Sequence, residues 1–118
     1  MIRIGIVGAE TSHTAAIAKT INVRKSIPGC RVVCLWGETD EFARKAAEAG
    51  AVPEIVSEPD EMVGGVDAVV IDHRHPKHHL PAAEPFLKAK VPMFIDKPFC
   101  YRLAEGKRFL SRARRAGV

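Results

Sequence analysis

The sequence predicts an α/β domain with a doubly wound parallel sheet. Short apolar, β-branched segments alternate along the chain with longer segments of helical periodicity. This alternation favours parallel pairing through right-handed crossovers, and strands that are apolar on both faces require helices on both sides of the sheet. A chain of 118 residues can build one such core, so we expect a single domain over residues 1–118.

Each expected element has a local signal. Ile2–Val7 is an apolar strand that ends at Gly8, and Thr11 and Ser12 are suitable caps for a helix that runs on from Thr14. The further strands expected are Arg31–Trp36, Ile55–Val56, Asp67–Asp72 and Pro92–Asp96. The further helices expected are Asp40–Ala49, a short helix begun by residues 57–60, His78–Ala89 and Tyr101–Ala116.

Glycine and proline mark several of the expected helix ends. Pro28 and Gly29 close the first helical region, whereas Asp40 is expected to cap the second helix and Gly50 to terminate it. In the segment 78–89, Pro81 can occupy the first turn. Pro85 should kink that helix or lie where its hydrogen-bond ladder is broken.

The net charge of +4 at pH 7 could favour a nucleic-acid partner, but the basic excess lies mostly on the last predicted helix. Apolar residues occupy the other side of that helix, so the basic side is typical of a face turned to solvent. No aromatic residues are interleaved for base stacking, and we expect no nucleic-acid binding. The basic residues concerned are Lys107, Arg108, Arg112, Arg114 and Arg115.

The cysteines and the hydropathy pattern indicate a reducing compartment. Cys30, Cys34 and Cys100 form no CxxC pair, and their odd number argues against a disulfide framework. The chain shows no charged leader before a long apolar run and no stretch of about 18 consecutive apolar residues. We therefore expect a cytoplasmic protein with no export signal and no membrane partner.

Candidate functional residues follow the predicted strands. In a doubly wound sheet, ligands bind outside the carboxyl ends of the strands, where the strand order reverses. All five histidines lie in or near these loops, including His78 and His79, and this concentration favours a site. The residues just after the strands are Gly8, Ala9, Glu10, Thr11, Ser12, His13, Gly37, Glu38, Asp72, His73, Arg74, His75, Asp96, Lys97 and Pro98.

The turn after the first strand is similar to a degenerate dinucleotide motif G-x-G-x-x-G. Gly8 supplies the first glycine, but Glu10 and His13 stand at the second and third glycine positions. A carboxylate about 5 Å from a phosphate would weaken binding by roughly 3 kcal/mol at an effective dielectric constant of about 20. Glu10 must therefore point away from the pyrophosphate, or cofactor binding is impaired.

Glu38 follows the second strand, where dinucleotide domains usually carry an acidic residue that holds the adenosine ribose hydroxyls. Such a carboxylate would favour NAD over NADP, because it repels a 2′-phosphate. An ordinary solvated glutamate in a loop is an equally good interpretation of the sequence alone.

The pattern as a whole resembles the N-terminal, Rossmann-type NAD(P)-binding domain of the Gfo/Idh/MocA oxidoreductases. The resemblance covers the whole chain and rests on the segments RIGIVG, AVPEIVSEPDEM, DAVVID and FIDKPFC, with His79 opening a helix. The family's Glu-Lys-Pro motif appears as Asp96-Lys97-Pro98. The resemblance implies that Lys97 contacts the substrate hydroxyl or the proton acceptor during hydride transfer, that Pro98 fixes the turn, and that the substrate is a sugar, polyol or related hydroxyl compound.

The resemblance also implies the remaining assignments. NAD is the expected cofactor, with NADP possible, and His79 joins the residues that follow the strands as a cofactor-binding candidate. Three departures limit this transfer of function: Glu10 in the glycine turn, Gly37 with Glu38 after the second strand, and His73-Arg74-His75 after the fourth.

Family members continue into a sixth strand and a substrate domain. We therefore expect this chain to be incomplete as an enzyme by itself and to take a small-molecule substrate only with a second domain. A sheet edge left uncovered should favour a homo-oligomer.

Two alternatives remain open at this point. The first is a noncatalytic nucleotide-binding or regulatory module with a degenerate cofactor site, which Glu10 favours. The second is a metal site built from His73, His75, His78 and His79, but the segment HRHPKHH lacks the spacing of H-E-x-x-H. We assign no metal ligand.

Overall fold

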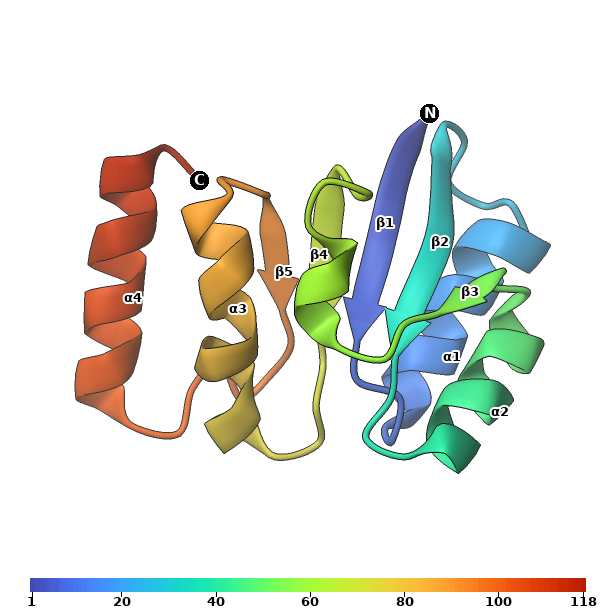
Figure 1. The fold of residues 1–118 in the computed structure, drawn as a ribbon, viewed down its shortest axis with the longest axis horizontal. Helices are drawn as coiled ribbons and strands as arrows, with labels where there is room; N and C mark the ends of the chain where they lie inside the picture. Colours follow the sequence, from blue (N-terminus) through green and yellow to red (C-terminus); the bar gives the residue numbers. More distant parts are fainter.

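The structure, a computed structural model that describes all 118 residues, contains a five-stranded sheet in the order β3-β2-β1-β4-β5 (Figure 1). Every neighbouring pair of strands is parallel, so the predicted doubly wound, Rossmann-type sheet is confirmed. The strands are β1 (Ile2–Val7), β2 (Cys30–Trp36), β3 (Glu54–Ile55), β4 (Ala68–Ile71) and β5 (Met93–Ile95).

Helices cover both faces of the sheet, with α1 and α2 on one side and α3 and α4 on the other (Figure 1). The α-helices are α1 (Ser12–Ala18), α2 (Asp40–Gly50), α3 (His79–Lys88) and α4 (Leu103–Ala116). Shorter helical segments are the π-helical η1 (Lys19–Val23), which continues α1, and the 3-10 segments η2 (Pro59–Met62) and η3 (Pro76–His78). None of these helices combines the length and apolar character that crossing a membrane would require.

Two apolar clusters, one on each face, hold the layers together. Successive residues of β1 point to opposite faces, so Ile6 packs in the cluster with Ala46 of α2, whereas Val7 packs in the cluster with Phe86 of α3. Ile6, Val7 and Phe86 are all fully buried. This alternation explains why the strands are apolar without interruption.

A bulge in β2 interrupts that alternation. The register between β1 and β2 shifts after Ile4, so Gly5 pairs with Cys34 and Val33 is skipped. Val33 and Cys34 consequently pack against the same cluster on the α3 side. A Cβ atom at Gly5 would lie 2.8 Å from the sulfur of Met62, so glycine is needed opposite the bulge.

Two of the expected helix signals were wrong. Thr39, and not Asp40, caps α2, because its side-chain oxygen accepts a hydrogen bond from the backbone N–H of Phe42 at 3.1 Å. Gly50 is the last residue of α2, and Ala51 takes the left-handed conformation of the cap, with φ of 50°.

The first helical region stops at Val23, five residues before Pro28, which was expected to close it. Other boundaries differ from expectation by one or two residues. The helix expected from Thr14 begins at Ser12, and the one expected from Tyr101 begins at Leu103. Pro81 lies in the first turn of α3, as predicted, and the helix continues through Pro85.

Candidate functional site

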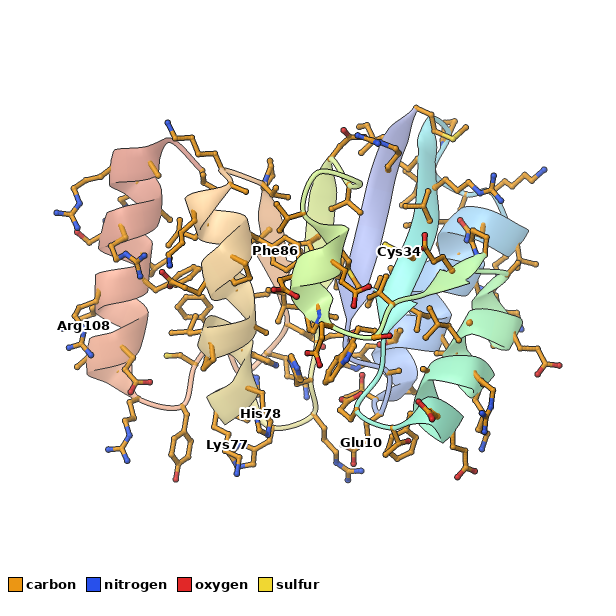
Figure 2. All side chains as sticks on the ribbon, in the orientation of Figure 1. Glu10, Cys34, Lys77, His78, Phe86 and Arg108 are labelled. Atoms are coloured by element: carbon orange, nitrogen blue, oxygen red, sulfur yellow. The ribbon has the colours of Figure 1, made fainter.

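The carboxyl ends of the strands bring the loops of interest together along one edge of the sheet, at the bottom of Figure 1. Figure 2 shows Glu10, Lys77 and His78 along this edge. Two pockets of about 360 and 540 Å³ open there, they share Glu10, His73 and Arg74, and no hydrophobic residue lines either. The first is also lined by Thr11, Ser12, His13, Asp96, Lys97 and Pro98, and the second by Glu38, His75 and His78.

Five of the candidate residues lie behind these pocket walls and do not line them: Gly8, Ala9, Gly37, Asp72 and His79. Gly37 has a packing reason, because a Cβ atom there would lie 2.8 Å from both the Cβ and the backbone nitrogen of Ala43 in α2. His79 is fully buried, and its Nε2 bonds with the carbonyl oxygen of His73 at 2.7 Å. His79 therefore supports the loop that carries His73.

Glu38 is anchored to the turn after β1. Its Oε1 accepts hydrogen bonds from the backbone N–H groups of Ala9 at 2.7 Å and Glu10 at 3.1 Å. Its Oε2 is buried and has no partner. One carboxylate oxygen thus fixes the side chain, and the other is left as an acceptor at the end of β2.

Gly8 allows the loops after β1 and β4 to pass each other. Its φ is 119°, a conformation that residues with a side chain rarely adopt, and an added Cβ would lie 2.6 Å from Oδ1 of Asp72. The same Cβ would lie 2.8 Å from the backbone nitrogen of His73. The one intact glycine of the degenerate motif is therefore required by this close approach.

Asp72 directly follows β4, and its side chain is fully buried beside Thr14. Burial raises the pKa of Asp72 to about 7, and the charges of Asp96 and Glu38 add to this increase, whereas the hydrogen bond from Thr14 opposes it. The Thr14 hydroxyl lies 2.8 Å from the carbonyl oxygen of Gly8 and 2.7 Å from Oδ2 of Asp72.

The Thr14 hydroxyl has one hydrogen, and both the carbonyl oxygen of Gly8 and Oδ2 of Asp72 can accept it. Thr14 therefore links Asp72 to the turn after β1. Its hydrogen bond to Asp72 favours the ionised carboxyl group, but burial has the larger effect on the pKa.

His13, Asp96 and Lys97 form a second polar cluster. Nδ1 of His13 contacts Oδ2 of Asp96, and the backbone N–H of Lys97 donates to Oδ1 of Asp96 at 2.8 Å. Burial raises the pKa of Asp96, but the hydrogen bonds from His13 and Lys97 outweigh it, and the pKa falls below its ordinary value. Lys97 itself is exposed, and the peptide bond between Lys97 and Pro98 is cis.

Glu10 pairs loosely with Arg74 across the rim between the two pockets. Oε1 of Glu10 lies 3.7 Å from a guanidinium nitrogen of Arg74, and both side chains are partly exposed. The carboxylate at the second glycine position thus has a cationic neighbour, which offsets its repulsion of an anionic ligand.

The histidine loop forms an aromatic row. His73 lies 5.5 Å from both Trp36 and His78 between ring centres, and His75 lies 5.4 Å from Tyr101. Burial lowers the pKa of His73 to about 4, so its ring is neutral at physiological pH. No group of three or more His, Cys, Asp or Glu side chains has the geometry to hold a metal ion, so the metal-site alternative gains no support.

Buried polar atoms without a hydrogen-bond partner mark this edge of the sheet. Unpaired polar atoms are rare in protein interiors, because leaving one unsatisfied costs about 1–3 kcal/mol. All such side-chain atoms in the structure belong to residues at or directly behind the carboxyl edge: Thr11 Oγ1, Glu38 Oε2, Asp72 Oδ1, His73 Nδ1 and His79 Nδ1. Their concentration indicates a place prepared for a polar ligand.

Sequence reasoning did not single out Thr14 or the pairing of His13 with Asp96. Thr14 was interpreted only as the start of a helix, although a threonine just inside a helix can bond to nearby backbone and acidic groups. The partners in the histidine pair are 83 positions apart and follow strands that are not neighbours in the sheet. No local spacing in the sequence reveals that contact.

Comparison with known proteins gives one match to a family. The sequence model of the Gfo/Idh/MocA oxidoreductases, described by their NAD-binding Rossmann fold, matches residues 2–118. No protein of curated function matches the sequence significantly.

Solved structures share the fold at low sequence identity. Apo scyllo-inositol dehydrogenase from Lactobacillus casei has a TM-score of 0.80 and 24% identity, over 99% of this chain and 34% of that one. Biliverdin reductase from Synechocystis, solved with biliverdin and NADP+, has a TM-score of 0.80 and 23% identity, over 98% of this chain and 35% of that one. An oxidoreductase from Agrobacterium radiobacter, solved with NAD+, L-tartaric acid and magnesium, has a TM-score of 0.83 and 15% identity, over 99% of this chain and 33% of that one. The chain spans about a third of the length of each.

Proposed function

Because the chain belongs to the Gfo/Idh/MocA oxidoreductase family, we propose that it binds NAD along its carboxyl edge as the cofactor domain of a dehydrogenase acting on a sugar, polyol or related hydroxyl compound. The observation that carries this proposal is the concentration of unpaired buried polar atoms beside two entirely polar pockets. Dinucleotide ligands of open α/β sheets occupy this same edge.

The residues present fit a dinucleotide. The unpaired Oε2 of Glu38 can accept from the adenosine ribose hydroxyls. The turn after Gly8 lines the pocket of about 360 Å³ at the start of α1, where the pyrophosphate can lie. Arg74 offers a cation to the phosphates. Lys97 lines the pocket of about 360 Å³, where it can polarise a substrate oxygen. When bound, the cofactor supplies a two-electron hydride acceptor. The other pocket residues that would contact the cofactor are His73, His75, Asp96 and Pro98.

We expect a preference for NAD over NADP because the anchored carboxylate of Glu38 would face a 2′-phosphate. Calorimetric titration of the chain with each oxidised cofactor tests this. NAD should bind at least about tenfold more tightly, which corresponds to about 1.4 kcal/mol. Glu38→Ser should remove the preference, and Glu48→Gln, at an exposed position in α2, is the control. Equal affinities in the wild type would contradict the role of Glu38.

A noncatalytic nucleotide-binding module is the second candidate function. The observation that favours it is Glu10, which occupies the second glycine position and lines both pockets. The two functions differ at Lys97: in a dehydrogenase, Lys97→Ala should abolish turnover and preserve cofactor affinity, whereas a noncatalytic module should show no turnover to lose.

We propose further that the 118 residues form one domain and that efficient turnover requires a second domain to enclose the substrate. The pockets at the carboxyl edge are open, so water has access to any substrate held there, and exclusion of water strengthens the electrostatic interactions of a site. Adding a second domain in trans, or as an extension of the chain, should raise the rate and leave the Lys97 requirement unchanged.

A further inference from the structure

The pocket of about 360 Å³ holds three groups suited to chemistry at a hydroxyl group. Asp96 and Lys97 follow β5 directly, and His13 comes from the first turn of α1. The His13 side chain is 45% exposed, and that of Asp96 is only 15% exposed. The imidazole therefore opens toward the pocket, whereas its carboxylate partner is largely enclosed.

Asp96 is fixed on both sides. Its Oδ1 accepts from the backbone N–H of Lys97 at 2.8 Å, and its Oδ2 contacts Nδ1 of His13. The two hydrogen bonds keep the carboxyl group ionised, and they do so against the effect of burial on its pKa. An ionised carboxylate can only accept hydrogen bonds, so the proton of the contact must lie on Nδ1 of His13.

A neutral imidazole with its proton on Nδ1 has a free lone pair on Nε2. We propose that His13 Nε2 is a proton acceptor for the substrate hydroxyl that Lys97 polarises, with Asp96 as the positioning residue that selects this form of the ring. This inference deepens the proposed function and rests on it. It places in this chain the proton transfer that Lys97 alone cannot perform.

The step balances as an alcohol oxidation. The O–H bond of the substrate breaks and its proton goes to Nε2, which makes His13 an imidazolium that the Asp96 carboxylate stabilises. The C–H bond on the same carbon breaks, and hydrogen leaves with the bonding pair to the oxidised nicotinamide dinucleotide, which is the oxidant. The carbon–oxygen bond becomes a carbonyl, and the Lys97 ammonium favours the charge that develops on oxygen.

Charged and titratable groups from the neighbouring elements also face this pocket. Glu10 and Arg74 form the loose pair across its rim, and His73 lines it from the loop after β4. Asp72, buried behind it, interacts with both His13 and Asp96. Asp96, and not Asp72, is the carboxylate in contact with the His13 ring.

The ring form can be measured in the free chain by nitrogen NMR of the histidine side chains at alkaline pH. We expect His13 to carry its proton on Nδ1, and the other four histidines serve as internal references. In Asp96→Asn, the amide oxygen should keep the bond from the Lys97 N–H and turn the NH₂ group toward His13. The ring proton should then move to Nε2. Asp60→Asn, an exposed substitution in η2, should change nothing.

Turnover is measured next, with the 118-residue chain at high concentration, NAD+ and a set of neutral polyols, by absorbance of the reduced cofactor. We expect slow oxidation by the wild type. Both His13→Gln and Asp96→Asn should lower its rate about a hundredfold, the usual size of a proton-transfer contribution. Both variants should still bind NAD+ saturably, which is measured by calorimetry on the same samples, and the rates are compared with NAD+ at saturation for each protein.

The outcomes separate this inference from the proposed function. A chain that binds no dinucleotide contradicts the proposed function, and the proton-acceptor role fails with it. A wild-type His13 ring protonated on Nε2, or a His13→Gln variant that oxidises polyols at the wild-type rate, overturns this inference alone.

Discussion

Asp72 should make the stability of the domain depend on pH in a direction opposite to that of a typical surface carboxylate. Its pKa is raised from 3.8 to about 7, chiefly by burial. Between these values the folded chain holds a proton that the unfolded chain has released, so the free energy of unfolding falls as pH rises through this window. The stability contributed by protonated Asp72 is fully present below the pKa of this group in the unfolded chain, and it is lost by about pH 7. A rise in pKa from 3.8 to about 7 corresponds to roughly 4 kcal/mol in the free energy of unfolding.

Asp72→Asn isolates that contribution. His73 changes protonation in an overlapping window with the opposite sign, because burial lowers its pKa to about 4 and its stabilisation is lost as pH falls. Only the difference between wild type and variant is therefore informative. Urea unfolding should show the variant more stable by a few kcal/mol at about pH 8 and equal to the wild type at about pH 4. A variant less stable at both values would mean that Asp72 is needed as a carboxylate.

Glu10→Gly should tighten the binding of NAD(H). The substitution removes a carboxylate that lines both pockets, and it releases Arg74 to pair with a phosphate. We expect a gain of about tenfold in calorimetric affinity, or about 1.4 kcal/mol. Arg74→Gln should weaken binding. An unchanged affinity in the glycine variant would show that Glu10 does not face the ligand.

At the residue scale, the sequence placed most of the pocket residues correctly at the edge of the sheet, because strand ends are visible in the hydropathy pattern. It could not reveal what those residues bind to within the chain. Glu38 was expected to meet a ribose, and the structure shows one of its oxygens bound to the Ala9 and Glu10 amides. Contacts of this kind depend on tertiary distances that no local pattern contains.

At the scale of elements, α1 and α2 pack closely because Gly50 has no side chain. A Cβ atom at Gly50 would lie 2.3 Å from the Cβ atom of Ala18 in α1. Gly50→Ala should therefore force the helices apart and lower the free energy of unfolding by about 1–3 kcal/mol. Urea unfolding measures this loss, and the dependence of the free energy of unfolding on urea concentration should be the same in the variant and the wild type.

The matched control for this prediction is Gly65→Ala. Its nearest neighbour would be the carbonyl oxygen of Met62 at 3.5 Å, an ordinary contact, so its effect should stay within about 0.5 kcal/mol. If the two variants were equally stable, helix packing would not be the reason for glycine at position 50.

Most elements were predictable from the sequence to within one or two residues, since five apolar runs alternate with helical patterns. The end of the first helical region was not, because it stops at Val23 and Pro28 and Gly29 lie beyond it. The bulge at Val33 and Cys34 was not, because a continuous apolar strand looks the same with or without a skipped residue. The cap of α2 was missed for a similar reason: Thr39 and Asp40 both favour a helix start, and only the structure shows which oxygen meets the Phe42 N–H.

At the scale of the whole molecule, the two edge strands of the sheet are short, and β5 carries Phe94 with 60% of its surface exposed. An uncovered edge with an exposed aromatic side chain favours association with another chain. We predict a homodimer or higher oligomer by light scattering, and Phe94→Lys should shift it toward the monomer. A wild-type monomer at high concentration would contradict this prediction.

The central claim is that a dinucleotide occupies the carboxyl edge of this sheet. Backbone amide NMR during titration with NADH tests it most directly, because every loop reports separately. We expect shifts confined to residues 8–13, 37–38, 72–75 and 96–97, with none in the pocket of about 580 Å³ at the opposite edge, which residues 29–31 help to line. Shifts in that opposite pocket, or no saturable shifts anywhere, would contradict dinucleotide binding at the carboxyl edge.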